Sequence, residues 1–195
     1  MFRAQLISRV AVVLLTAGCL EVDPASNRID FDFTVDGINE GWEVGAADYP
    51  VGKEADVAVV GDRRAIPPAL GTANGLYQAG TPYNGNLFVY QRKFWDNFRR
   101  STQVRVKIQL IYITNYHAGC TTGPGPSVFL KAGVSDLEPR SDPDGQGIYR
   151  FSLDKGVGSA GGDYVAFGDI RNGQSGCPAT GTFVARTTGV LTPVL

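Results

Sequence analysis

The 195-residue sequence contains little of what most metal centres and catalytic dyads require. It has one histidine, three cysteines and one methionine, which excludes most metal sites built from several His and Cys ligands. Charged residues make up 19% of the chain and the formal net charge is −1. Nucleic-acid-binding proteins carry a clear basic patch, so we expect no nucleic-acid partner. Nothing in the composition indicates a cofactor or a metal site.

The sequence also lacks convincing amphipathic helices. Short runs of β-branched and aromatic residues recur instead, separated by turn-forming residues, among them 25 glycines and 11 prolines. We expect strands at 29–35, 55–60, 75–78, 87–94, 103–114, 127–134, 147–153, 164–167 and 182–186, with one helical candidate at 94–100. Short strands at this spacing predict an all-β fold, an antiparallel β-sandwich.

The clearest strand pattern lies at residues 103–110. Apolar and polar residues alternate strictly there, which places Arg105, Lys107 and Gln109 on the solvent face. The run then continues through residues 111–114, where both faces become apolar. We therefore expect one long strand that is half-buried at its start and buried on both faces at its end.

The N-terminal residues have the pattern of an export signal. Arg3 and Arg9 flank a stretch without acidic residues, and the apolar run at 10–15 is shorter than the ~20 residues that span a bilayer. Small residues follow, and Cys19 comes directly after an Ala-Gly pair. This order resembles the lipobox of bacterial lipoproteins, in which the cysteine is lipid-modified, for instance with palmitate, and becomes the N-terminus.

The lipobox resemblance implies how the chain is organised. Residues 1–18 would be a signal peptide, and lipidation of Cys19 would anchor the protein to a membrane of the bacterial cell envelope. Leu20, where aspartate would imply inner-membrane retention, implies the outer membrane if the host has one. Residues 19–28 are expected to form a tether, and 29–195 a single sandwich domain. An ordinary secretory signal, with Cys19 as a free thiol, is the alternative.

The other two cysteines favour a disulfide. Cys120 and Cys177 both lie in glycine-rich segments, and an exported protein meets an oxidising compartment. Two free thiols are one alternative. A nucleophilic pair of Cys120 with His117 is another, because an imidazole can activate a nearby thiol.

Two further motifs favour turns over ligand sites. Residues 156–161 match G-x-G-x-x-G, but a dinucleotide site needs a helix after the glycines and a strand is expected instead. Residues 141–147 contain Asp142 and Asp144, yet their glycine comes too early for an EF-hand loop. We interpret both segments as turns.

Aromatic residues next to amide side chains are the remaining candidates for ligand binding. Sugar rings stack on exposed aromatic rings, while amides bind sugar hydroxyls. The candidate ligand-binding residues are Tyr83, Asn84, Asn86, Trp95, Tyr116 and His117. Packing of these rings in the core is the alternative for each.

Two stretches carry resemblances to known groups. Residues 31–33 before Gly41 and Trp42 resemble the opening strand of jelly-roll carbohydrate-binding modules. Residues 115–120, 127–133 and 168–173 are similar to a group of bacterial envelope lipoproteins, which implies an envelope location and supplies no catalytic residues. The chain ends on apolar residues 187–195 where that group continues through another strand. We therefore also consider a jelly-roll-like sandwich that lacks its last strand.

These observations lead to one hypothesis and two alternatives. The leading hypothesis is a lipid-anchored, non-catalytic β-sandwich that binds a glycan such as an envelope polysaccharide. The first alternative is a secreted hydrolase, which would have to use His117 because the chain has no other histidine. The second is a structural or assembly lipoprotein that binds another envelope protein.

Overall fold

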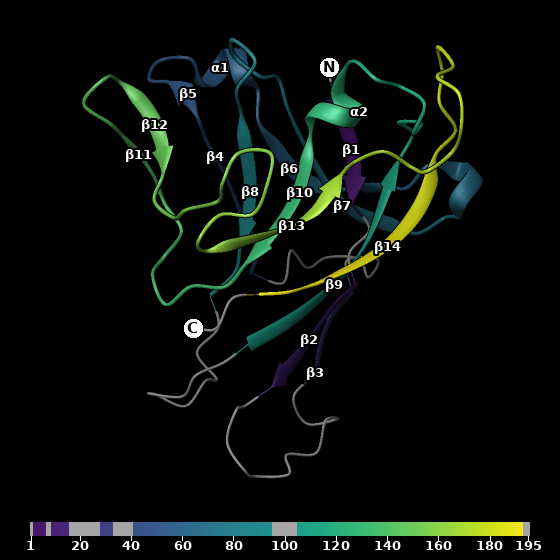
Figure 1. Ribbon diagram of the computed structural model, residues 1–195, viewed down its shortest axis with the longest axis horizontal. Coiled ribbons are helices and arrows are strands. Elements are labelled where there is room, and N and C mark those ends of the chain that lie inside the picture. Colours follow the sequence, from purple (N-terminus) through teal and green to yellow (C-terminus); the bar gives the residue numbers. More distant parts are fainter. Residues whose placement is uncertain (1, 7–8, 16–27, 33–40, 95–104, 193–195) are drawn as a thin grey trace.

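The regular elements of the described chain are mostly short β-strands (Figure 1). The computed structural model describes residues 2–6, 9–15, 28–32, 41–94 and 105–192. The strands are β1 (Phe2–Leu6), β2 (Arg9–Leu15), β3 (Arg28–Asp32), β4 (Glu43–Ala47), β5 (Tyr49–Pro50), β6 (Val60–Ala65), β7 (Asn74–Gly80), β8 (Phe88–Arg92), β9 (Arg105–Thr114), β10 (Phe129–Gly133), β11 (Ser141–Pro143), β12 (Ile148–Phe151), β13 (Tyr164–Asp169) and β14 (Val184–Leu191). The helical turns are α1 (Glu54–Val57), α2 (Pro124–Ser127) and the 3₁₀ turn η2 (Pro68–Leu70). The predicted all-β class is confirmed.

The strands form one large sheet and three small ones, and all the strands pair antiparallel. The large sheet has seven strands in the order β3-β2-β9-β1-β7-β6, with β14 also paired to β9. The small sheets are β4–β8, β10–β13 and β11–β12–β5. In Figure 1 the β10–β13 pair crosses in front of the large sheet, and side chains of both line one cavity described below.

The predicted signal segment 1–18 contributes two strands to the large sheet. β1 pairs with β7 and β9, and β2 pairs with β3 and β9. Cleavage before Cys19 would remove both strands from the edges of β7 and β9. Cys19 and the tether residues up to 27 lie outside the described residues, so the signal and the lipidation stay predictions.

Strand β9 follows the sequence pattern closely. Val106 and Leu110 are buried, whereas Lys107 and Gln109 between them are exposed. Residues 112–114 are then buried in succession, each with at most 5% exposure. The prediction of a strand that becomes buried on both faces is confirmed, because successive residues of a strand point to opposite sides of the sheet.

The prediction of a strand at 55–60 is wrong. Residues up to Val57 form the helical turn α1, and β6 begins at Val60. Ala58 has a φ of 44° and its N–H donates to the carbonyl of Glu54, which ends the turn. Within α1 only Val57 is buried, so the segment buries one side chain in a single turn instead of every second residue along a strand.

The remaining strand predictions divide into three groups. The runs at 75–78, 87–94, 127–134, 147–153, 164–167 and 182–186 overlap β7, β8, β10, β12, β13 and β14 and are confirmed. Strands β4, β5 and β11 were not predicted, and the predicted strand at 55–60 shares a single residue with β6. These four strands escaped prediction because they contain Gly, Ala, Pro or charged residues. Residues 33–35, 95–100 and 193–195 and the side chain of Arg105 lie outside the description.

The last strand leaves an open edge in the described part of the chain. β14 pairs with β9 from Val184 opposite Thr114 to Leu191 opposite Lys107. No described strand pairs with its other edge. An unpaired edge of this kind offers free backbone donors and acceptors to another chain.

Candidate functional site

A cavity of about 510 Å³ lies between the large sheet and strands β8, β10 and β13. Its wall is mainly apolar and comes from segments far apart in the sequence. It includes Leu76, Leu87, Val89, Ile108, Leu110, Val128, Leu130, Phe167 and Ile170. Volume and lining both match those of small-molecule binding sites, which are mostly apolar with a few placed polar groups.

Two lysines line the cavity among these apolar residues. Lys155 Nζ lies 2.8 Å from an Asp48 carboxylate oxygen and 5.1 Å from the centre of the Phe88 ring. Lys131 Nζ donates to the carbonyl oxygens of Lys155 at 2.5 Å and Ser159 at 2.7 Å. Burial lowers the pKa of Lys131, and the nearby charge of Lys155 lowers it further. The carbonyl contacts hold the Lys131 ammonium at the wall of the cavity.

A buried amide also lines the cavity. The side-chain nitrogen of Gln78 on β7 is buried and has no hydrogen-bond partner in the described part of the protein. A buried donor without a partner costs about 1–3 kcal/mol.

Two tyrosines of the lining are positioned by glycines on the neighbouring strands. Tyr90 lies opposite Gly45, and Tyr164 lies opposite Gly133. A Cβ at either glycine would collide with the facing ring, so each ring covers the surface that the glycine leaves free. Both rings contact Phe151, at centroid distances of 4.8 Å and 5.7 Å. The result is a fixed aromatic cluster at one end of the cavity.

Burial keeps the hydroxyls of this cluster protonated. Desolvation raises the pKa of Tyr164 to about 12, and burial is also the main cause of the raised pKa of Tyr90. Both hydroxyls are therefore neutral at physiological pH. They can donate a hydrogen bond but do not act as bases there.

The loop after β12 forms part of the rim. The Asp154 carboxylate accepts hydrogen bonds from the amides of Gly156 at 3.0 Å and Gly162 at 2.7 Å, which lower the pKa of Asp154. Strand β13, not a helix, follows at Tyr164. The prediction that no helix follows the G-x-G-x-x-G segment is confirmed, but the prediction of a hairpin is wrong, because β12 and β13 belong to different sheets. Val157 in this loop is 91% exposed.

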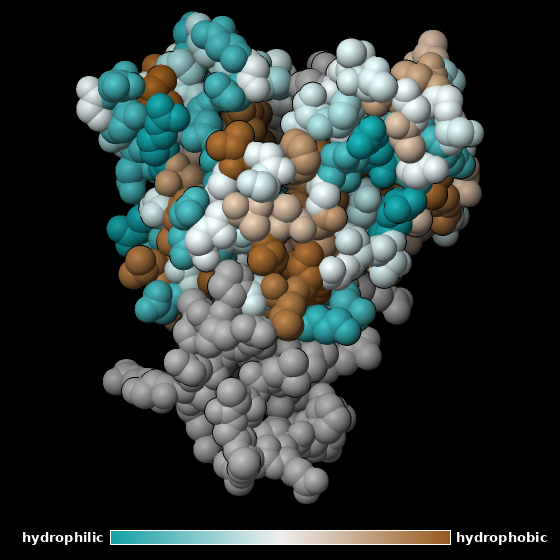
Figure 2. Space-filling view, in the orientation of Figure 1, coloured by the Kyte–Doolittle hydropathy of each residue, from teal (hydrophilic) through white to brown (hydrophobic). Residues whose placement is uncertain are grey.

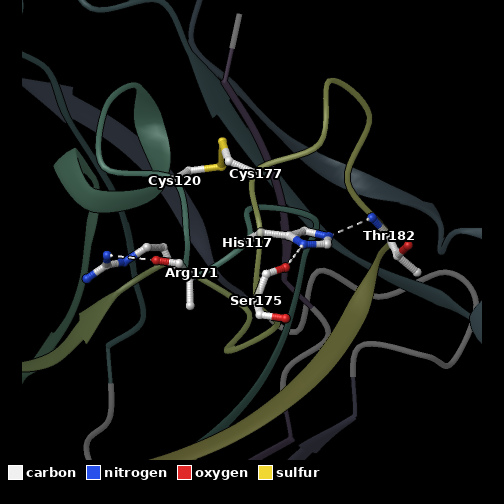
Figure 3. Close-up of a disulfide and its surroundings, with 7 residues drawn as sticks. His117, Cys120, Arg171, Ser175, Cys177 and Thr182 are labelled. Atoms are coloured by element: carbon white, nitrogen blue, oxygen red, sulfur yellow. Dashed lines mark hydrogen bonds between the residues drawn. A yellow bond between two sulfur atoms is a disulfide. The ribbon is translucent and has the colours of Figure 1, made fainter.

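A disulfide joins Cys120 and Cys177, 57 residues apart, as predicted (Figure 3). Oxidation removes the thiolate that a nucleophilic cysteine needs. The alternatives of two free thiols and of a pair of Cys120 with His117 are therefore wrong. The bridge connects the segment after β9 to the segment before β14.

His117 lies beside this disulfide and holds the same two segments together (Figure 3). Its Nδ1 lies 3.0 Å from the Ser175 carbonyl oxygen, to which it donates, and its Nε2 accepts the Thr182 N–H at 3.3 Å. The side chain is 9% exposed. Because both ring nitrogens are bound to the backbone, neither is available to take a proton from a substrate.

The predicted ligand-binding residues fall in two separate places. Tyr83, Asn84 and Asn86 lie in the turn between β7 and β8, where Tyr83 pairs with Asn86. Asn86 lines the large cavity. Tyr116 and His117 line a small hollow near the disulfide. Trp95 lies outside the described residues. Sequence reasoning missed Gln78 and Lys131, and the only signal for Lys131 was a charge inside an apolar strand.

The described residues contain no group of three or more His, Cys, Asp or Glu side chains placed to hold a metal ion. Asp144, considered above for calcium, instead accepts the amides of Gln146 and Ile148 and pairs with Arg150. Of the helices in the described segments, none has the length and apolar character to cross a membrane.

No protein-family model matches the chain, and neither a curated protein nor a solved structure shows significant similarity to it. The resemblances to envelope lipoproteins and to carbohydrate-binding modules therefore stay predictions.

The disulfide should contribute measurably to stability. We expect the double variant Cys120→Ser/Cys177→Ser to lose about 2–4 kcal/mol in free energy of unfolding, because a bridge over a span this long restricts the unfolded chain. Urea denaturation measures this loss. A reductant should destabilise the wild type by a similar amount and leave the variant unchanged. Equal stability of both proteins without reductant would contradict the expectation.

The buried hydroxyl of Tyr164 should make stability fall at high pH. Between its ordinary pKa near 10 and its folded value of about 12, Tyr164 ionises in the unfolded chain but not in the folded one. Unfolding then releases a proton, so stability is lost as pH rises through this window. Denaturation of Tyr164→Phe between about pH 9 and 11 should show a shallower decline. Tyr83→Phe, in the outer turn, is the control, and an identical slope for both variants would refute the role of Tyr164.

Proposed function

We propose that this chain is a non-catalytic ligand-binding protein of the bacterial envelope. The observation that carries the proposal is the cavity of about 510 Å³, whose apolar wall holds a few polar side chains. We also propose that the sheets pack as a jelly-roll-like sandwich. The large sheet would form one layer, the β4–β8 and β10–β13 pairs the other, and the cavity would lie between them.

The chemistry of the side chains supports binding over catalysis. A nucleophile needs a base within hydrogen-bonding distance, but both ring nitrogens of His117 bind backbone groups. Cys120 and Cys177 are bonded to each other. These contacts weigh against the hydrolase alternative.

The lining favours an apolar ligand over a glycan. Each sugar hydroxyl that enters a cavity loses its hydrogen bonds to water and needs new partners. Leu, Val, Ile and Phe are the largest group of side chains in the wall, and these side chains provide none. Of the residues predicted for a glycan, Asn86 lines the large cavity and Tyr116 and His117 line the small hollow, so these three do not form one stacking platform.

A cavity-filling variant tests the site. A neutral apolar dye such as N-phenyl-1-naphthylamine should gain fluorescence with the wild type. Ala132→Trp, at a lining position on β10, should weaken binding about tenfold or more, a loss of ~1.4 kcal/mol. Ala185→Trp places the same side chain on the exposed face of β14 and should bind like the wild type.

Two results would overturn the proposed site. The first is a folded wild type that gives no fluorescence gain with the dye. The second is an Ala132→Trp protein that binds the dye normally and melts like the wild type. Far-ultraviolet circular dichroism establishes folding in both cases.

Attachment to the envelope through Cys19 has support from the sequence pattern alone. An alkyne analogue of palmitate should label the protein in cells, and Cys19→Ala should abolish the label because the thiol that receives the lipid is gone. The Cys120→Ser/Cys177→Ser protein should keep it. Intact mass should correspond to residues 19–195 plus lipid. Label that persists in Cys19→Ala, or the mass of the full chain, would show that the anchor is elsewhere or absent.

A further inference from the structure

The cavity has an excess of positive charge at one side. Both Lys131 and Lys155 line it, and Lys155 pairs with Asp48. Within the described residues no carboxylate forms an ion pair with Lys131, whose acceptors are two backbone carbonyls. Asp154 lies near enough to oppose the lowered pKa of Lys131, but its own carboxylate oxygens are bound to loop amides. A half-buried ammonium therefore lies in the lining of the cavity without a carboxylate in ion-pair contact.

The chemistry of Lys131 restricts the ligand. A ligand group that contacts Lys131 must present acceptor atoms, because an ammonium donates only. A negative charge on those atoms would strengthen the hydrogen bonds.

The rest of the lining favours a ligand with an apolar hydrocarbon chain. Leu76, Leu110 and Ile170 are 7% exposed or less and form the inner wall. The rim is apolar too: Phe129 is 37% exposed, and Gly158 of the rim loop lies close enough that a Cβ there would contact the Phe129 ring at 3.6 Å. Figure 2 shows hydrophobic residues reaching the surface at the lower centre of this face. A hydrocarbon chain would meet apolar atoms from the rim to the inner wall.

We propose that the cavity binds a long-chain amphiphile, with its alkyl chain against the apolar wall and an acidic head group accepting a hydrogen bond from Lys131. This inference rests on the proposed function, because it names the ligand class of the same cavity. Carboxylate and phosphate heads share the required chemistry. A cationic head would add a third positive charge beside Lys131 and Lys155, and a plain hydrocarbon would bring no anion to the Lys131 ammonium.

The test compares four ligands of equal chain length on the detergent-free, delipidated full chain. Dodecanoate and dodecyl phosphate carry acidic heads, dodecanol a neutral head and dodecylamine a cationic one. Displacement of N-phenyl-1-naphthylamine, below the critical micelle concentration of each ligand, gives the relative affinities. We expect the two acids to bind about tenfold or more tighter than dodecanol, and dodecylamine to bind weakest. The order of the two acids identifies the preferred head.

Variants of Lys131 assign the head-group contact. Lys131→Met keeps the stem and removes the charge, so it should weaken the acids about tenfold or more while dodecanol changes less than about twofold. Lys131→Arg should restore most of the affinity for the acids. Lys107→Met, on the exposed face of β9, is the matched control and should bind all four ligands like the wild type.

The outcomes separate this inference from the function on which it rests. If the dye binds but the acids show no advantage over dodecanol, or Lys131→Met does not reduce that advantage, the amphiphile assignment is wrong and the cavity remains a binding site for a neutral ligand. If the wild type binds neither the dye nor any dodecyl ligand, the proposed function itself fails.

Discussion

The pairing of β9 with β14 is the constraint on which both candidate sites depend. This strand of ten residues pairs with β14 from Lys107 to Thr114, and that pairing involves no residue of the predicted signal segment. The middle of β9 supplies Ile108 and Leu110 to the wall of the large cavity. The segment directly after it carries His117 and Cys120. The cavity wall and the disulfide region thus take their positions from one strand.

The end of β9 also explains why the disulfide region is built as it is. Residues 112–114 are buried, so the segment that follows them must pack against the protein interior. His117 bonds to backbone at Ser175 and Thr182, and Arg171 donates to the carbonyl of Ala118. These hydrogen bonds satisfy backbone N–H and C=O groups of segments that lie outside the strands. The histidine is therefore structural, and the disulfide fixes the same two segments covalently.

Sequence patterns predicted the parts of the fold that depend on nearby residues. The alternation in β9 could be predicted because the period of a strand depends only on neighbouring residues. The disulfide between Cys120 and Cys177 could be predicted because the export signal indicates an oxidising compartment. The turn α1 was misread since its apolar residues also fit a period of two. The cavity could not be predicted, because its wall combines β7, β8, β9, β10 and β13, whose relative placement comes only from folding.

The glycines of β4 and β10 also show which features sequence patterns cannot predict. Gly45 and Gly133 look like interruptions of strands, since glycine in a strand offers no side chain to pack. In the fold they lie under the rings of Tyr90 and Tyr164. An absent side chain on one strand thus determines where an aromatic ring sits on the next, and only the cross-strand register reveals it.

The distribution of charge gives the cavity its particular character. Elsewhere in the described chain several cations are matched at the surface: Arg92 bridges Glu43 and Glu138, and Arg150 pairs with Asp144. Such exposed pairs contribute little, often less than about 1 kcal/mol, because water already solvates each partner. Lys131 is different, since burial removes part of its water while its hydrogen bonds go to backbone carbonyls and no carboxylate of the described residues forms an ion pair with it. Unmatched charge in a poorly solvated site favours an anion far more than the same charge on a wet surface does, so this lysine determines which ligands the cavity favours.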